Sequence, residues 1–188
     1  MAYDCQAVAG LITRAHELGE YSEGQFKEVD VAVMVGVPLA GKSTLSRYLK
    51  EKYRYVVVCP DTVRTAIHGR QFIHSAEPFV WATVEAMVRV FLTQGDKVVV
   101  DATNTHPAAR QKWLRIAKEF DKTVGAFVVQ TPFSVSYERN EELQRLDPSV
   151  IDRMVKQFKA PSVDEGFDVI YDVYSDSVDD YYFAERNS

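Results

Sequence analysis

Residues 36–44 of this 188-residue chain read Gly36-Val37-Pro38-Leu39-Ala40-Gly41-Lys42-Ser43-Thr44. They match the pattern G-x-x-x-x-G-K-[ST], which is typical of a phosphate-binding loop. An apolar run of strand length, residues 31–35, precedes the loop, and apolar residues at helical spacing follow it from Leu45 onward. A strand, a glycine loop and a helix in this order form the context in which the pattern binds a nucleotide.

Each residue type in the loop has a physical task. Glycine at positions 36 and 41 allows backbone angles that side chains forbid, so the loop can direct its N–H groups at an anion. The helix that follows adds the positive end of its dipole. We expect Lys42 to reach the β- and γ-phosphates of ATP and the Ser43 hydroxyl to ligate Mg²⁺. The predicted nucleotide-binding residues of the loop are Gly36, Pro38, Ala40, Gly41, Lys42, Ser43 and Thr44.

Composition narrows the class of protein. Hydrophobic residues make up 46% and charged residues 26%, as in one soluble globular domain, and no apolar run approaches membrane-spanning length. The net charge of −5 argues against a broad basic surface for nucleic acid, although it permits a local basic pocket. Two cysteines and no basic leader predict a reducing compartment, the cytoplasm or, for a phage protein, the cytoplasm of the host.

Alternating apolar runs and helical patterns organise the chain. Strands are predicted near residues 29–35, 55–59, 97–101, 124–130 and 167–174, with helices near 62–68, 79–94, 107–120, 132–143 and 149–158. This alternation predicts an α/β fold, a three-layer sandwich with a central parallel sheet. The helical hairpin at 132–158 is predicted to form a lid over the nucleotide.

The predicted domain, residues 29–174, is flanked by two shorter segments. Residues 1–28 form an N-terminal extension with an amphipathic helix over 5–18, which either packs on the core or offers a surface to a partner. Residues 175–188 are rich in acids and are predicted to be a solvated tail. The oligomeric state is left open by the sequence.

Polar residues follow three of the predicted strands. Gly36 begins the loop after the first strand, Asp61 closely follows the second, and Asp101 ends the third. Because ligands bind at the carboxyl ends of parallel strands, we expect these segments to form one site. Asp101 is predicted to hold Mg²⁺, directly or through water, together with Ser43.

Three kinds of nucleotide chemistry compete. No glycine has Asp three residues before it, as a switch GTPase requires, and no Asn-Lys-x-Asp pattern for guanine occurs. Motor ATPases commonly place Glu directly after the strand-end Asp, where this chain has Ala102. A phosphotransferase needs a base for the acceptor hydroxyl and cations for the phosphoryl group, and Asp61 and Arg64 supply both on one helical turn. In the alternative interpretation, Asp61 only caps its helix and Arg64 is solvated.

The predicted lid is basic. It carries Arg139 and Arg145, which we expect to contact the phosphates and to neutralise charge in the transition state. The alternative is an ordinary surface helix in which these arginines pair with the neighbouring glutamates at 138, 141 and 142.

In combination, these motifs resemble the 5′-hydroxyl polynucleotide kinases, the kinase domains of phage and bacterial end-healing enzymes. The resemblance covers about residues 30–174 and is carried by the phosphate loop, by Asp61-Thr-Val-Arg64, by Asp101-Ala-Thr-Asn104 and by Glu138-Arg139-Asn140. It implies that Asp61 is the general base, that Arg64 binds the acceptor-side phosphate, and that Lys42 and Arg139 contact ATP.

The chain departs from the family pattern in places. Leu143 stands where the family often has a second lid arginine, and Arg145 is the next one. Leu39 and Ala40 replace a small pair, and we expect both to adopt ordinary non-glycine angles. No D-x-D-x-T phosphatase motif occurs.

Three functions follow from these patterns. The first is ATP-dependent transfer of phosphate to a 5′-hydroxyl end of DNA or RNA, in nucleic-acid repair or DNA modification, with the nucleic-acid end as partner and no membrane. The second is phosphorylation of another hydroxyl, on a hydroxymethylated base, a nucleoside, a tRNA or a small molecule. The third is a nucleotide-binding regulatory protein without an acceptor, against which Asp61 and Arg64 argue, since a nucleotide sensor needs no acceptor base.

Overall fold

The structure is a computed structural model that describes residues 22–23, 26–69, 72–175 and 180–186. Its strands are β1 (Ser22–Glu23), β2 (Val31–Val35), β3 (Val56–Val58), β4 (Val98–Val100), β5 (Val124–Val129), β6 (Val169–Ser175) and β7 (Tyr181–Glu185). Its helices are α2 (Lys42–Tyr53), α3 (Pro60–His68), α4 (Glu77–Gln94), α5 (Pro107–Glu119), α6 (Phe133–Leu143) and α7 (Pro148–Lys156), with single 3₁₀ turns at His74–Ala76 and Val163–Glu165. The helix predicted over 5–18 lies outside the described residues.

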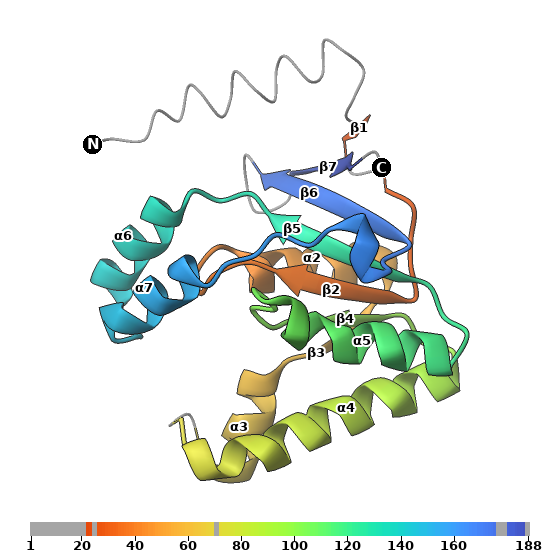
Figure 1. The fold of residues 1–188 in the computed structure, drawn as a ribbon, viewed down its shortest axis with the longest axis horizontal. Helices are drawn as coiled ribbons and strands as arrows, with labels where there is room; N and C mark the ends of the chain where they lie inside the picture. Colours follow the sequence, from red (N-terminus) through yellow and green to blue (C-terminus); the bar gives the residue numbers. More distant parts are fainter. Residues whose placement is uncertain (1–21, 24–25, 70–71, 176–179, 187–188) are drawn as a thin grey trace.

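The strands form one sheet in the order β1-β7-β6-β5-β2-β4-β3. The pairs from β6 through β3 are parallel, whereas β7 runs antiparallel to both β6 and β1. In Figure 1, α4 and α5 lie below the sheet, and α6 and α7 stand together at the end toward which the parallel strands point. The chain therefore crosses over between parallel strands through helices, as predicted.

Strand β2 shows how the sequence builds two cores. Val31, Val33 and Val35 face a cluster that includes side chains of α4 and α5, whereas Ala32 and Met34 face a cluster that includes α2 and β7. Successive side chains of a strand point to opposite faces, so an unbroken apolar run indicates a strand buried on both sides. The predicted three-layer sandwich with a central, mostly parallel sheet is confirmed.

The prediction of a solvated tail is wrong for residues 181–185. They form β7, paired with β6, and Tyr181 and Phe183 are buried in the core on the α2 face of the sheet. Arg186, the next residue, forms a two-pronged ion pair with Asp172 of β6. The acidic residues around this short run obscured its period-2 alternation, which is typical of a half-buried strand.

Helices α3 and α7 both begin before their predicted starts. Helix α3 begins at Pro60 with Cys59 as its N-cap residue, so Asp61 lies in the first turn and does not cap the helix. Proline favours this first helical position because its missing N–H would have no partner there. Helix α7 begins at Pro148 and is capped by Asp147, whose side chain accepts a hydrogen bond from the N–H of Ser149.

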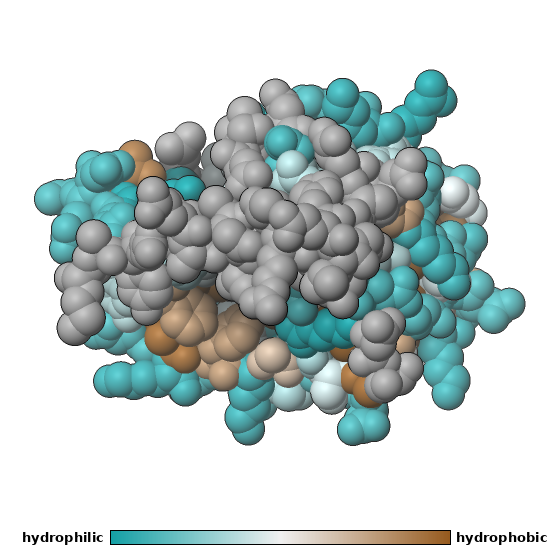
Figure 2. Space-filling model, turned by 90° about the horizontal axis from the view of Figure 1, so that it is seen from above, coloured by the Kyte–Doolittle hydropathy of each residue, from teal (hydrophilic) through white to brown (hydrophobic). Residues whose placement is uncertain are grey.

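Figure 2 views the molecule from above, where the described surface is largely hydrophilic, with hydrophobic residues gathered in a few small patches. Within the described ranges, no helix has the length and apolar character needed to cross a membrane.

Candidate active site

The phosphate loop connects β2 to α2 at the carboxyl end of the sheet. Gly41 has a φ of 104°, a left-handed conformation that glycine adopts without strain, and α2 begins at the next residue. The first N–H groups of a helix have no partner within it, so the start of α2 offers donors to an anion. The Lys42 Nζ donates to the carbonyl oxygen of Val37 at 2.7 Å, which folds the side chain back along the loop.

Leu39 does not adopt an ordinary backbone angle, contrary to the prediction. Its φ is 63°, in the left-handed region, where a non-glycine residue costs about 1–2 kcal/mol. Two side chains hold the loop in this shape. The Arg139 Nη1 donates to the carbonyl oxygen of Leu39 at 2.7 Å, and the Thr131 Oγ1 donates to that of Ala40 at 2.7 Å.

The prediction that Gly36 adopts backbone angles forbidden to side chains is also not confirmed. Its φ does not lie in the left-handed region, unlike that of Gly41. A Cβ at Gly36 would lie 3.6 Å from the Cβ of Ala40 and from two carbons of Lys42, which is ordinary contact. The conformational argument for glycine therefore applies to Gly41 and not to Gly36.

Lys42 and Asp101 are two buried groups of opposite charge behind the loop. Each side chain belongs to a residue that is only 7% exposed. Burial lowers the pKa of Lys42 to about 8, although the negative charges of Asp101 and Asp61 favour its charged form. Burial raises the pKa of Asp101, while a hydrogen bond from Ser43 and the charge of Lys42 act in the opposite direction. These contacts bring Lys42, Ser43 and Asp101 together.

Backbone contacts join the three strand ends. The N–H of Asp101 donates to the carbonyl oxygen of Val58 at 2.9 Å, and the N–H of Gly36 donates to that of Thr103 at 3.0 Å. The Asn104 side chain donates to the carbonyl oxygen of Met34 at 2.8 Å, at the end of β2. The phosphate loop and the loop after β4 are therefore held against each other.

Asp61 stands at the solvent side of this group. Its side chain is 80% exposed, and its Oδ1 accepts a hydrogen bond from the Arg64 Nη1 at 2.5 Å. Since Cys59 is the N-cap residue of α3, capping does not explain the carboxylate. An exposed carboxylate oriented by a guanidinium can accept a proton from an incoming hydroxyl group.

Arg64 is not solvated, and the residue that holds it was missed by sequence reasoning. Glu77, the first residue of α4, accepts from the Arg64 Nε and Nη2, both at 2.7 Å. The two side chains are 14% and 13% exposed. Removing one partner of a buried ion pair costs about 3–5 kcal/mol, so this pair is a strong constraint on Arg64. No sequence spacing relates position 77 to position 64, and so no local pattern indicated it.

Phe72 lies beside the same guanidinium. The Cζ of Arg64 is 5.7 Å from the centroid of its ring. The residue is 62% exposed, so it does not belong to the core. An aromatic face is thus available to a ligand next to Asp61 and Arg64.

The helical hairpin α6–α7 reaches the phosphate loop through one of its two predicted arginines. Arg139 contacts the Leu39 carbonyl, whereas the described residues offer the exposed Arg145 side chain no hydrogen bond or ion pair. Asn140 fixes the turn between the helices, since its side chain both donates to and accepts from the backbone of Leu146. The alternative in which Arg139 pairs with neighbouring glutamates is not what the structure shows.

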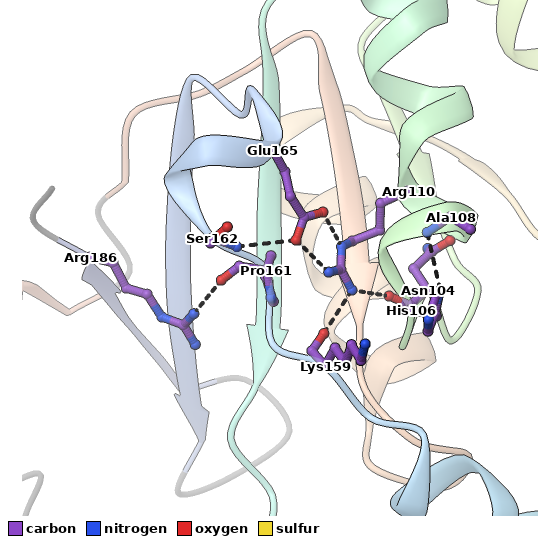
Figure 3. A network of polar contacts seen from close by, with 9 residues as sticks. All are labelled: Asn104, His106, Ala108, Arg110, Lys159, Pro161, Ser162, Glu165 and Arg186. Carbon is purple, nitrogen blue, oxygen red and sulfur yellow. Dashed lines mark hydrogen bonds and ion pairs between the residues drawn. The ribbon is translucent and has the colours of Figure 1, made fainter.

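A buried arginine anchors the far side of the site, and it too was missed. Arg110 of α5 is fully buried and forms two hydrogen bonds with the Glu165 carboxylate, at 2.8 and 2.6 Å (Figure 3). Its Nη1 also donates to the carbonyl oxygens of Asn104 and Lys159, at 2.8 and 2.9 Å. Arg110 therefore ties the loop after β4 to the segment that follows α7.

This anchor gives a stability prediction. Arg110→Ala should lower the free energy of unfolding by about 3–5 kcal/mol, because it removes the only positively charged partner that the described residues give to the largely buried Glu165 carboxylate, which keeps a hydrogen bond from the N–H of Ser162. Arg115→Ala on the same helix is the matched control, since the Arg115 pair with Glu119 is 3.7 Å long and its side chain is 64% exposed. The control should lose less than about 1 kcal/mol. Urea unfolding measures both, and equal losses would contradict this role for Arg110.

Comparison with known proteins shows the family to which this chain belongs. Residues 31–161, well over half of the chain, match the family model AAA_33, described as an AAA domain. The chain belongs to this family. Together with the sheet order and the loop geometry, the match identifies a P-loop kinase domain, and a P-loop kinase fold implies nucleotide binding.

Two relatives are themselves named as kinases. An L-seryl-tRNA(Sec) kinase of Methanococcus maripaludis is 25% identical over 143 residues, which cover 73% of this chain and 55% of the relative. A bifunctional polynucleotide phosphatase/kinase of Schizosaccharomyces pombe is 25% identical over 158 residues, 81% of this chain and 35% of the relative. The chain thus spans about half or less of the length of these relatives.

A solved structure shows the same fold. The chain matches a chain of the Pnkp1/Rnl/Hen1 RNA repair complex with a TM-score of 0.62 and 24% identity. The match covers 71% of this chain and 45% of the other. At this identity the likeness concerns the fold alone.

Proposed function

We propose that this P-loop kinase domain transfers the γ-phosphate of ATP to a 5′-hydroxyl end of DNA or RNA. The observation that carries the proposal is the exposed Asp61 carboxylate, oriented by Arg64 near the buried Lys42 of the phosphate loop. A pure nucleotide sensor has no need of such a base. The names of the two relatives, one acting on a seryl-tRNA and the other on polynucleotides, support a hydroxyl group carried by nucleic acid.

The chemistry follows from the side chains present. Asp61 accepts the proton of the acceptor hydroxyl as the oxygen forms a bond to the γ-phosphorus. The bond between that phosphorus and the bridging oxygen breaks, and ADP leaves with the electron pair. Lys42 and Arg139 supply positive charge for the phosphates, and the N–H groups at the start of α2 supply hydrogen bonds. Arg145, exposed on the same lid, is a further phosphate contact in this proposal.

The donor set also fits Mg²⁺. The Ser43 hydroxyl lies close enough to Asp101 to oppose the rise in the pKa of that carboxyl group, which places one hydroxyl and one carboxylate together. Among the described residues no three His, Cys, Asp or Glu side chains could form a metal cage. Mg²⁺ in kinase sites is held by few protein ligands together with water and the substrate phosphates, and the pair suits this arrangement. When bound, the ion would neutralise charge on the β- and γ-phosphates.

An acceptor screen with radiolabelled ATP tests the proposed function. We expect label on 5′-hydroxyl DNA or RNA oligonucleotides. The panel also contains a nucleoside, duplex DNA with hydroxymethylated bases and a seryl-tRNA, the last because the M. maripaludis relative covers 73% of this chain. Label on one of these acceptors without transfer to 5′ ends would replace the proposed substrate with that acceptor.

The lid arginine gives a second prediction. Arg139→Ala should lower kcat by about 10²–10³-fold, because it removes a positive donor directed at charge that develops during transfer. Arg153→Ala, an exposed arginine of α7, is the control and should leave kcat unchanged. Steady-state kinetics with a 5′-hydroxyl oligonucleotide measure both variants. Equal activity in Arg139→Ala and the wild type would show that Arg139 does not contribute to the reaction.

The lowered pKa of Lys42 gives a pH prediction. In the free protein this group loses its proton near pH 8, whereas bound phosphates favour the charged form and raise its pKa. Nucleotide binding therefore takes up a proton above pH 8, and the Kd for ATP should rise about tenfold per pH unit there. Titrations from pH 7 to 10 measure this dependence. Lys42→Arg is the control, since its guanidinium stays charged, and the same flat profile in both proteins would contradict the prediction.

A further inference from the structure

The acceptor side of the site holds more negative than positive charge. Arg64 lies between the carboxylates of Asp61 and Glu77, so the three side chains together carry a net charge of −1. Of the five N–H donors of a guanidinium, two point to Glu77 and one to Asp61. Only one N–H on each terminal nitrogen is left, and an anionic phosphate would meet a neutralised cation there.

We infer that Glu77 is a specificity-determining residue: by neutralising Arg64, it makes the site recognise the terminal nucleoside of the acceptor and not the phosphate that follows it. This inference rests on the proposed function and deepens it. Glu77 acts through Arg64 and is a positioning residue. It differs from the role that family resemblance implies, in which Arg64 binds the acceptor-side phosphate.

Burial explains why Arg64 would not exchange Glu77 for a phosphate. Both side chains are largely shielded from water, at 14% and 13% exposure, and the ion pair is bidentate. Release of Arg64 would leave the Glu77 carboxylate unpaired in a poorly solvated position. The Arg64 guanidinium already lowers the pKa of Glu77, so the pair is charged throughout the neutral range.

Phe72 supplies the contact that a nucleoside needs. Its ring is exposed beside Arg64, next to the carboxylate that would receive the proton. Nucleobases stack on such aromatic faces with little regard to sequence. An acceptor held in this way presents its 5′-hydroxyl to Asp61 without an ionic contact to the first phosphate.

The experiment compares two 5′-hydroxyl oligonucleotides that differ at the first linkage. One has a normal phosphodiester there, and the other has an uncharged methylphosphonate. For the wild type we expect values of kcat/KM within about threefold of each other, since residual long-range attraction is screened by salt. In Glu77→Gln, Arg64 is free to bind the phosphate, and the preference for the phosphodiester should rise to about tenfold to hundredfold.

Glu85→Gln is the matched control on the same helix. Glu85 pairs with Lys112 at 3.5 Å, and its loss should not change the preference. Phe72→Ala should raise the KM of both oligonucleotides by about tenfold with little change in kcat. A strong preference for the phosphodiester in the wild type overturns the inference, and this holds even if Glu77→Gln fails to fold. Absence of transfer to either oligonucleotide overturns the proposed function, and with it this inference.

Discussion

Replacing Asp61 with Asn is expected to lower the turnover number by about 10²–10⁴-fold, the usual contribution of a general base. The amide keeps the size of the side chain but cannot take the proton of the acceptor hydroxyl. ATP binding should persist, because the phosphate loop and Lys42 are unchanged. Single-turnover transfer and the Kd for ATP, measured on the same preparation, separate the two effects.

The position of Asp61 in the structure separates a catalytic role from a role in helix stability. Asp61 is 80% exposed and lies in the first turn of α3, after the N-cap residue Cys59, so Asn should not destabilise the helix. Asp147→Asn is the control, since Asp147 is an acidic residue that does cap a helix. It should keep full activity. Full activity in Asp61→Asn as well would remove Asp61 from the mechanism.

Replacing Lys42 with Met is expected to lower transfer by about 10³-fold or more, because the phosphates lose a buried positive charge that no water can replace. Met keeps the length of the apolar stem. Folding should not suffer, since burial lowers the pKa of Lys42 to about 8 and its charged form is therefore a cost to the folded state. The Val37 carbonyl loses one hydrogen bond, worth about 1 kcal/mol.

Lys50→Met on the same helix is the control for Lys42→Met. Lys50 is exposed in the last turn of α2, and its loss should change neither transfer nor stability by a large amount. Urea unfolding and transfer to a 5′-hydroxyl oligonucleotide are measured on both variants. Turnover near the wild-type value in Lys42→Met would exclude the phosphate loop from the reaction, whereas a collapse in stability would assign the lysine to the fold.

Local patterns determined the parallel core of the sheet and the place of the loop. The runs at 31–35, 98–100 and 124–129 are buried strands in the structure because an unbroken apolar stretch of that length has few other ways to be covered. The loop pattern predicted a helix directly after it, and α2 begins at Lys42 inside the pattern. The same patterns brought Asp61 and Asp101 to one end of the sheet, since parallel strands end together.

Strand β7 shows the limit of such patterns. A short segment becomes a strand when a free edge is available to pair with it, and β6 offers that edge to residues 181–185. The acids nearby indicated solvation, yet the alternate burial of Tyr181 and Phe183 outweighs them. The start of α3, by contrast, could have been predicted from the sequence alone. Proline favours the first position of a helix, so Pro60 indicated the start more accurately than Asp61 did.

The sequence by itself determined the nucleotide loop, the fold class and the carboxylates at the strand ends, because these depend on spacing along the chain. Tertiary structure alone decided which polar groups from distant parts of the chain meet. Arg64 finds Glu77 thirteen residues away, Arg110 finds Glu165 fifty-five residues away, and the Leu39 carbonyl meets Arg139 one hundred residues away. Such pairs form where folding removes water from two groups at once, and no periodicity of helix or strand records that event.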